Sequence, residues 1–226
     1  MVQLTQTAIL QDPEDIPRLK QEFAETGCAL LPNFLAPGIL RRAMEWVQSA
    51  RFEETQEKDE HRGVFGTTLL APGTEPALFL LKFILNRNDL YRFSEQVTDC
   101  EKIANFHGRL HRTTPRAEQH IDWHQDLAEG RTLGICINLS SEPYTGGVLE
   151  IRNPEHRMTA AVGRGNPGDA CFFRIDRGWQ HRLTPVESGC RTVGVGWFRT
   201  APQWSDYAFR AERVRQMAAE YGSVKR

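Results

Sequence analysis

The chain of 226 residues has the size of one large domain or two small ones, because folded domains average roughly 150 residues. Its 28 lysines and arginines nearly balance its 29 aspartates and glutamates, leaving a formal net charge of -1. Without an excess of positive charge, we expect no binding to nucleic acid and no attraction to a membrane surface. The hydrophobic content of 40% is typical of a globular protein and excludes intrinsic disorder.

The sequence predicts neither a membrane span nor a disulfide framework. The longest apolar run, from Ala77 to Leu85 with Lys82 inside it, is far shorter than the roughly 20 residues that a bilayer requires. The first residues carry no cationic start and no long apolar segment, so we expect no secretory signal and a cytosolic location. The cysteines are odd in number and never spaced as Cys-x-x-Cys, which predicts reduced and mostly buried thiols at Cys28, Cys100, Cys136, Cys171 and Cys190.

The amino-terminal part shows the periodicity of helices. A first helix is predicted from Asp12 as N-cap, with Pro13 as its first residue, to Gly27. Its apolar stripe consists of Ile16, Leu19 and Phe23. A short strand is predicted over 28–32, and Pro37 begins a second helix with apolar residues at Leu40, Ala43, Met44 and Val47.

The stretch from residue 51 to residue 97 is less regular. Residues 51–76 are charged and then rich in glycine, proline and threonine, which predicts a loop and a candidate lid over any site. From Pro76 to about Val97 the pattern fits a helix, although the Leu-Phe-Leu-Leu run fits a buried strand equally well.

From about Lys102 the hydrophobic period changes to two, as in strands that bury one face. The clearest alternation places apolar side chains at Leu133, Ile135, Ile137 and Leu139. We therefore expect a single, mainly β domain with flanking helices. It comprises a helical part over about 1–100, a β core over about 101–200 and a closing helix over about 204–222.

A cluster of histidines suggests a metal site. Four of the seven histidines, His107, His111, His120 and His124, fall within 18 residues. In an extended segment His124 and Asp126 point to the same side, because residues two apart share a face. His181 could supply a third ligand. Two histidines and one carboxylate form the facial arrangement that holds non-haem Fe(II) and leaves positions open for dioxygen and a bidentate co-substrate.

A buried cation is predicted ten residues after His181. Arg191 begins the strand predicted over 191–198, and a guanidinium on the inward face of a barrel strand is costly unless it meets a carboxylate. A dicarboxylic co-substrate would supply that partner.

These residues belong to an ordered set of motifs across residues 105–200. The set comprises His124-x-Asp126, Gly146-Gly147, Pro167-Gly168-Asp169, His181 with Thr184-Pro185-Val186, Gly189-Cys190-Arg191 and Gly196-Trp197-Phe198. The order resembles that of the Fe(II)/2-oxoglutarate-dependent dioxygenases, in the branch similar to prolyl hydroxylases. A weaker likeness covers residues 27–35.

The resemblance implies a double-stranded β-helix, which is a jelly-roll barrel of cupin type. It implies that His124, Asp126 and His181 bind Fe(II) as the catalytic centre, and that Arg191 binds the distal carboxylate of 2-oxoglutarate. The implied reaction is hydroxylation of a small molecule or of an amino-acid or peptide side chain, with release of succinate and CO2. Related halogenases have Gly or Ala in place of Asp126, so its presence favours hydroxylation. The alternative is a cupin-type metal-binding protein that is non-catalytic or that works without 2-oxoglutarate.

One departure from the family pattern leaves a question open. The branch often carries a tyrosine on the strand before His-x-Asp, which helps to bind 2-oxoglutarate, whereas the stretch 105–111 here has none. His107, Arg109 or His111 could take its place. We predict His111 and Asn138 as co-substrate contacts besides Arg191, although Asn138 could equally face solvent.

A second triplet, His120-Ile121-Asp122, competes for the metal because residues 120, 122, 124 and 126 share parity. We favour His124 and Asp126, since they leave a short turn before the next strand. Trp197 shares parity with Arg191 and is predicted to be packing. The basic cluster of Arg109, Arg112 and Arg116 is either solvated or recruits an acidic substrate group, and no motif identifies the substrate.

Overall fold

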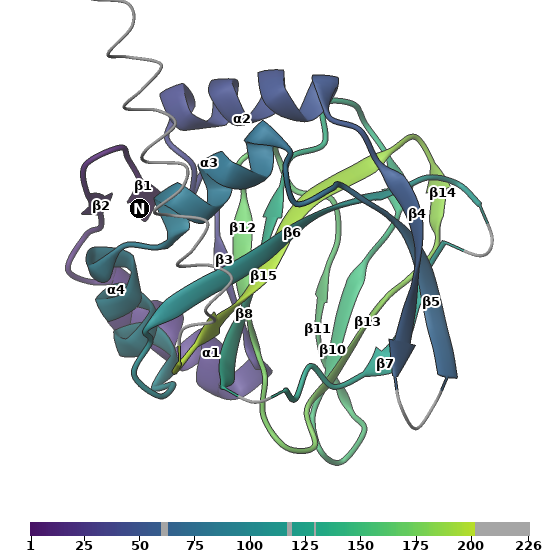
Figure 1. Ribbon diagram of the computed structural model, residues 1–226. Helices are drawn as coiled ribbons and strands as arrows, with labels where there is room; N and C mark the ends of the chain where they lie inside the picture. Colours follow the sequence, from purple (N-terminus) through teal and green to yellow (C-terminus); the bar gives the residue numbers. More distant parts are fainter. Residues whose placement is uncertain (60–62, 117–118, 129, 202–226) are drawn as a thin grey trace, which may run out of the picture.

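The computed structural model describes residues 1–201 apart from 60–62, 117–118 and 129 (Figure 1). Its helices are α1 (Asp15–Thr26), α2 (Pro37–Ser49), α3 (Pro76–Leu85) and α4 (Asn88–Thr98). The main strands are β3 (Cys28–Leu31), β4 (Glu53–Asp59), β5 (Gly63–Leu70), β6 (Asn105–Thr113), β7 (Ile121–His124), β8 (Arg131–Asn138), β10 (Leu149–Arg152), β11 (Met158–Val162), β12 (Ala170–Arg174), β13 (Gln180–Leu183) and β15 (Arg191–Arg199). Two small pairs are formed by β1 (Gln3–Leu4) with β2 (Ile9–Leu10) and by β9 (Thr145–Gly146) with β14 (Val186–Ser188). The helix predicted over about 204–222 lies outside the described residues.

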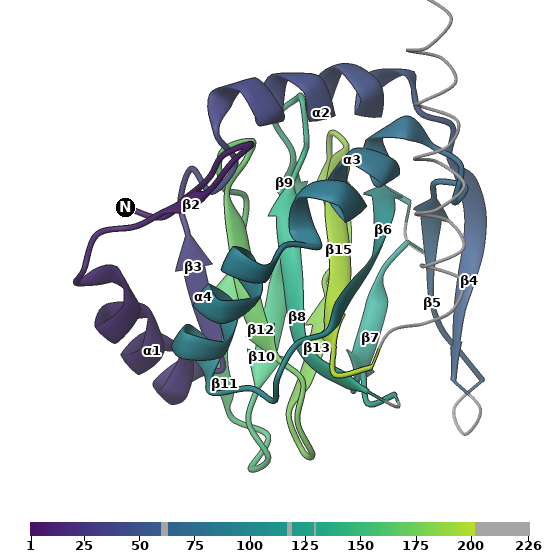
Figure 2. The same cartoon turned by 60° about the vertical axis from the view of Figure 1, so that its left-hand side comes forward.

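The main sheet has eleven antiparallel strands in the order β11-β10-β13-β7-β5-β6-β15-β8-β12-β3, with β4 paired to β5. The sheet curls so that β11, β10, β13 and β7 face the layer formed by β6, β15, β8, β12 and β3 (Figures 1 and 2). Strand β5 joins the two layers, because its edge opposite β4 pairs with β6 through Leu69 and Leu70 and with β7 through Gly66. This mainly β, jelly-roll architecture with flanking helices confirms the predicted fold class.

Helices α1, α3 and α4 cover the outer face of the second layer (Figure 2). The larger hydrophobic core lies between them and the sheet, and it includes Leu133, Ile135 and Ile137 of β8. A smaller cluster lies between the two layers and includes Ile151 and Phe173. The period of two thus sends one set of side chains toward the helices and the other set into the barrel.

The predicted helices are largely confirmed, with one shifted boundary. Helix α1 begins at Asp15 rather than at Pro13, because the chain first makes a turn in which the amide of Asp15 bonds the carbonyl of Asp12. The helix ends as predicted at Gly27, whose φ of 70° is left-handed and suits glycine. The open question over residues 76–97 is decided in favour of helix, as α3 and α4. Among the described residues, no helix combines the length and apolarity that crossing a membrane requires.

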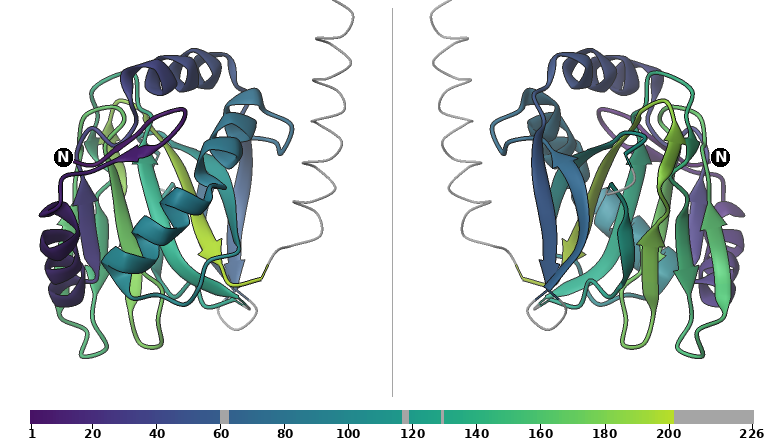
Figure 3. Two further views of the ribbon diagram at one scale, coloured as in Figure 1. Left: turned by 90° about the vertical axis from the view of Figure 1, so that its left-hand side faces the viewer. Right: turned by 90° about the vertical axis from the view of Figure 1, so that its right-hand side faces the viewer.

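The prediction of a loop over 51–76 was wrong. Strands β4 and β5 form a hairpin there, at the end of the molecule opposite α1 (Figure 3). Strand β4 pairs with β5 alone, so its sequence Glu-Glu-Thr-Gln-Glu-Lys-Asp is that of a charged edge strand. Such an edge has little need of apolar side chains, and its composition therefore resembles that of a loop.

Candidate functional site

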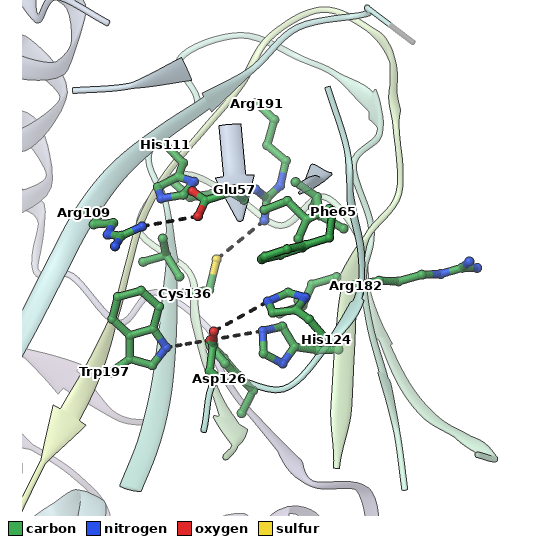
Figure 4. Close-up of a pocket in the computed structure, with 17 residues that line it drawn as sticks. Glu57, Phe65, Arg109, His111, His124, Asp126, Cys136, Arg182, Arg191 and Trp197 are labelled. Carbon is green, nitrogen blue, oxygen red and sulfur yellow. Dashed lines mark hydrogen bonds and ion pairs between the residues drawn. The ribbon is translucent and has the colours of Figure 1, made fainter. Parts of the chain in front are cut away.

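Three predicted ligands, His124, Asp126 and His181, line one cavity, and Figure 4 shows His124 and Asp126 pointing toward each other there. His124 ends β7 and lies directly opposite His181 of β13, with ring centroids 4.2 Å apart. Asp126 follows β7, and its carboxylate lies 3.2 Å from His181 Nε2 and 3.6 Å from His124 Nε2. The ligand atoms of the three side chains all lie within 4.8 Å of one another, so they could hold a metal ion. Two imidazole nitrogens and one carboxylate oxygen suit Fe(II).

A β-bulge explains why the competing triplet lies elsewhere. His181 pairs with His124 and Leu183 with Ile121, so three intervals on β7 match two on β13. The extra residue reverses which face the side chains occupy, so shared parity no longer implies a shared face. The side chain of Asp122 is 69% exposed and lies 3.6 Å from His120. Neither residue lines the cavity that holds the triad.

The backbone fixes the orientation of the His124 ring. Its Nδ1 lies 2.8 Å from the carbonyl oxygen of Asp122, which can only accept a hydrogen bond. Nδ1 therefore donates this hydrogen bond, and Nε2, on the side of Asp126, is the nitrogen that could bind a metal. Phe65 packs against the same ring, with centroids 4.9 Å apart.

The carboxylate of Asp126 is held from several sides. The indole Nε1 of Trp197 donates a hydrogen bond of 2.6 Å to its Oδ2. Arg131 lies 3.5 Å from Oδ1 and stacks on Trp197, with its guanidinium carbon 3.7 Å from the ring centroid. Burial alone would raise the pKa of Asp126, but His181, His124 and Trp197 outweigh burial and lower the pKa well below its usual range. Trp197, predicted as packing, thus also orients a candidate metal ligand.

Arg191 lies on the inward face of β15, as its parity predicts. It is buried, and its Nη2 donates to the sulfur of Cys136 at 3.6 Å, whereas its Nε has no hydrogen-bond partner among the residues that the structure describes. Gly147 makes room for it, since a Cβ there would lie 2.8 Å from the Cδ of Arg191. Burial raises the pKa of the Tyr144 phenol, and the charge of Arg191 partly opposes this. The guanidinium therefore faces the cavity with donor capacity unused.

His111 lies across from Arg191 in the same cavity and belongs to β6. Its Nδ1 lies 3.3 Å from the hydroxyl of Thr68, and no described residue hydrogen-bonds to its buried Nε2. Burial, helped by the charges of Arg109 and Arg191, lowers the pKa of His111 to about 3. The ring is therefore neutral at pH 7 and offers one polar nitrogen to the cavity.

The structure does not bring Asn138 to the cavity. Its amide nitrogen donates to the carbonyl of Gly165 at 2.8 Å, and its side-chain oxygen accepts from the amide of Ser140 at 3.1 Å. Asn138 shares a face of β8 with Cys136, two residues earlier, and Cys136 does line the cavity. Asn138 lies one step too far along β8, where it braces the loop before β12 instead. This position corrects the expected contact with the co-substrate.

The predicted arginine cluster is divided by the fold. Arg109 lines the cavity, whereas Arg112 covers Phe52 with its guanidinium carbon 3.9 Å from the ring centroid. Arg116 is exposed and lies 3.6 Å from Glu54. His107 stacks on Trp197 and does not line the cavity. Of the four basic residues, only Arg109 faces the site.

The cavity itself is narrow, with a volume of about 90 Å3. Strand β15 contributes four alternate side chains to it, Arg191, Val193, Val195 and Trp197. Two lining residues that sequence reasoning missed, Glu57 and Phe65, come from the β4–β5 hairpin. Their segment was predicted as a lid, which was the only signal available for them. Cys136 could have been found from its parity with Asn138.

Comparison with known proteins gives one family match and many similar folds. Residues 108–199, which include the three candidate ligands and Arg191, match the model of the 2OG-Fe(II) oxygenase superfamily. No curated protein matches the chain in sequence.

Three solved structures illustrate the similarity of the fold. An oxidoreductase of the 2OG-Fe(II) oxygenase family from Burkholderia pseudomallei has a TM-score of 0.63 at 14% identity, covering 84% of this chain and 93% of that one. A prolyl hydroxylase from Trichoplax adhaerens, in complex with a hypoxia inducible factor peptide fragment, has a TM-score of 0.59 at 16% identity, covering 84% and 94%. SnoN, an α-ketoglutarate-dependent epimerase of nogalamycin biosynthesis, has a TM-score of 0.61 at 14% identity, covering 83% and 84%. At these identities the likeness concerns the fold.

Proposed function

We propose, on the premise that this chain is a 2OG-Fe(II) oxygenase with a fold similar to that of the prolyl hydroxylases, that it hydroxylates an unactivated C–H bond. In the balanced reaction, substrate C–H, O2 and 2-oxoglutarate give substrate C–OH, succinate and CO2. The substrate is a small molecule or an amino-acid or peptide side chain. The cytosol stays the predicted location.

One observation carries the proposal. A single cavity holds both a His-Asp-His set whose ligand atoms lie within 4.8 Å of one another and a buried guanidinium whose Nε has no partner. The first suits Fe(II) and the second suits a carboxylate, so together they match a metal and a dicarboxylic co-substrate. A metal-binding protein without a co-substrate would have no use for Arg191.

Each residue has a defined task in this scheme. His124 and His181 would hold the metal through Nε2, and Asp126 would hold it through its carboxylate, which Trp197 orients. Bound Fe(II) supplies the redox chemistry with dioxygen that no side chain can perform.

The other end of the cavity serves the co-substrate. Arg191 pairs with the distal carboxylate of 2-oxoglutarate, and the neutral His111 donates or accepts one further hydrogen bond there. The apolar walls, among them Phe173 and Leu149, limit access of water.

The test is the weak visible absorption band that forms when Fe(II) and 2-oxoglutarate are added together without oxygen. The band is expected in the wild-type protein and in Asp122→Ala, and it is expected to be lost in Asp126→Ala. Succinate formation under air should follow the same order, with a loss of more than about a thousandfold in Asp126→Ala.

Two results would contradict the proposal. A wild-type protein that binds Fe(II) but gives no band with 2-oxoglutarate would be the alternative, a cupin-type metal-binding protein. Loss of the band in Asp122→Ala rather than in Asp126→Ala would assign the metal to the competing triplet. Product analysis by mass spectrometry then separates hydroxylation, with a gain of one oxygen, from epimerisation, with no change in mass.

A further inference from the structure

A pair of opposite charges projects into the cavity from two different elements (Figure 4). Glu57 belongs to β4 of the hairpin, and Arg109 belongs to β6 of the main sheet. Glu57 Oε2 lies 3.5 Å from Arg109 Nη1, which is an ion pair with a long contact. Both residues line the cavity that holds the candidate metal ligands.

Glu57 has an unused acceptor. Its side chain is only 17% exposed, and its buried Oε1 has no hydrogen-bond partner within the described ranges of the chain. A buried carboxylate oxygen that makes no hydrogen bond costs free energy, because water has been removed and nothing replaces it. The position therefore suits a ligand that donates a hydrogen bond, and a cationic donor most of all.

Arg109 has unused donors. A guanidinium carries five N–H groups, and the only carboxylate found near Arg109 among the described residues is that of Glu57. Its side chain is 33% exposed, so the guanidinium can be reached from the mouth of the cavity. It also lies over Trp197, with its guanidinium carbon 5.3 Å from the ring centroid, and Trp197 donates to Asp126. A group bound to Arg109 is thus separated from a candidate metal ligand by one side chain.

We propose that Glu57 and Arg109 bind the ammonium and the carboxylate of a free α-amino acid, which is the substrate that the enzyme hydroxylates. The inference rests on the proposed function, because it places the substrate beside the predicted iron. An α-amino acid carries its ammonium and its carboxylate on the same carbon, so it can meet both members of the pair at once. A purely anionic ligand would leave Glu57 unsatisfied and repelled, and an internal residue of a peptide carries neither charge.

The first experiment measures binding directly. Saturation-transfer NMR is recorded on protein loaded with Zn(II) and 2-oxoglutarate, with each of the twenty common L-amino acids as probe. The strongest binder is then compared with its decarboxylated amine and its deaminated carboxylic acid, and each is expected to bind at least about tenfold more weakly. The inference is overturned if none of the twenty binds, or if the amine or the acid binds as well as the amino acid.

The second experiment uses matched variants. Glu57→Gln and Arg109→Gln should each weaken amino-acid binding by about tenfold or more, with an unchanged half-saturating concentration of 2-oxoglutarate. Glu54→Gln and Arg116→Gln are the controls, because this second ion pair also joins β4 to the region after β6 but is exposed on both sides. Unchanged amino-acid binding in the first two variants, or an equal loss in all four, would overturn the assignment.

These measurements test the proposed function and the amino-acid site separately. A missing Fe(II)–2-oxoglutarate band contradicts the proposed function, whereas the NMR measurement with Zn(II) still reports whether the pair binds amino acids. A normal band together with no amino-acid binding contradicts only the inference about Glu57 and Arg109.

Discussion

The two faces of strand β15 carry opposite kinds of side chain. On one face Phe198 packs in the larger core, and Gly194 lies against Leu81 of α3. On the other face Arg191 and Trp197 enter the cavity. Successive residues therefore serve stability and chemistry in turn, because neighbouring side chains of a strand point to opposite faces.

The two faces also differ in whether their buried side chains include polar atoms without hydrogen-bond partners. The helix-facing side is filled by apolar side chains that gain free energy from burial itself. On the cavity side, Arg191, His111 and Glu57 each bury a polar atom that has no partner within the described part of the chain. Such atoms weaken the folded state unless a ligand completes them. The comparison therefore predicts that variants on the two faces have separable effects on stability and on binding.

The largest stability effect is expected on the helix-facing side. Phe172 of β12 is fully buried in the larger core, so Phe172→Ala should lower the free energy of unfolding by roughly 3–5 kcal/mol. Urea denaturation measures this loss, and the folded fraction should still bind 2-oxoglutarate with unchanged affinity. A loss below about 1 kcal/mol would show that the helices contribute little to the core.

A pH dependence should come from the cavity side. The pKa of His111 is about 3 in the folded state, below the ordinary value of 6.5, so the unfolded chain binds more protons between these two values. Stability from this residue is full above pH 6.5 and falls as the pH decreases toward 3. Between pH 7 and pH 4.5 the loss should be roughly 2–3 kcal/mol, at 1.36 kcal/mol per pKa unit.

Denaturation at the two pH values checks this expectation. His111→Gln should remove that part of the pH dependence, whereas His156→Gln, on an exposed turn, should leave it unchanged. Identical pH dependence in the wild type and His111→Gln would mean that the ring is not held neutral by burial.

The buried guanidinium should matter for binding more than for folding. Arg191→Met keeps the length of the side chain but removes the charge, and it should raise the half-saturating concentration of 2-oxoglutarate by about tenfold to a hundredfold. Its melting temperature should not fall, because the wild-type Nε is already without a partner. Arg177→Met, at an exposed position, is the control. Unchanged 2-oxoglutarate binding in Arg191→Met would contradict the predicted role.

The smallest effect is expected from the residue that orients Asp126. Trp197→Phe removes the 2.6 Å hydrogen bond and keeps an aromatic ring, so Fe(II) affinity should fall by about tenfold. Competition with a fluorescent chelator measures the affinity. Trp46→Phe is the control, since Trp46 also lies under an arginine but on α2, away from the cavity. Equal metal affinity in both variants would show that Trp197 contributes packing and does not orient Asp126.

Much of the architecture could be read from local patterns. Helix α2 and strand β8 lie where the periodicity of apolar residues predicted them, because each buries one face and leaves the other polar. The hairpin of β4 and β5 was not predicted from these patterns. An edge strand rich in charge has no apolar period, and only its pairing with β5 makes it a strand.

The candidate site was foreseen in part for the same reason. Parity along β15 placed Arg191 and Trp197 on one face, and both enter the cavity. Parity along β7 did not separate the two His-x-Asp triplets, because the bulge that reverses the faces depends on the register between β7 and β13. Parity along β8 showed which face Asn138 occupies but not how far along the strand the cavity extends. Asn138 was therefore placed at the site in error.

By itself, the sequence determined the class of fold, the order of its elements and the residue types of a metal and carboxylate site, because these follow from periodicity and from the chemistry of ordered motifs. Only the tertiary structure decided which triplet converges with His181, what holds Asp126, and that Glu57 contacts Arg109 at the cavity. Those facts depend on register, a bulge and contacts between strands far apart in the chain, and no local pattern encodes them.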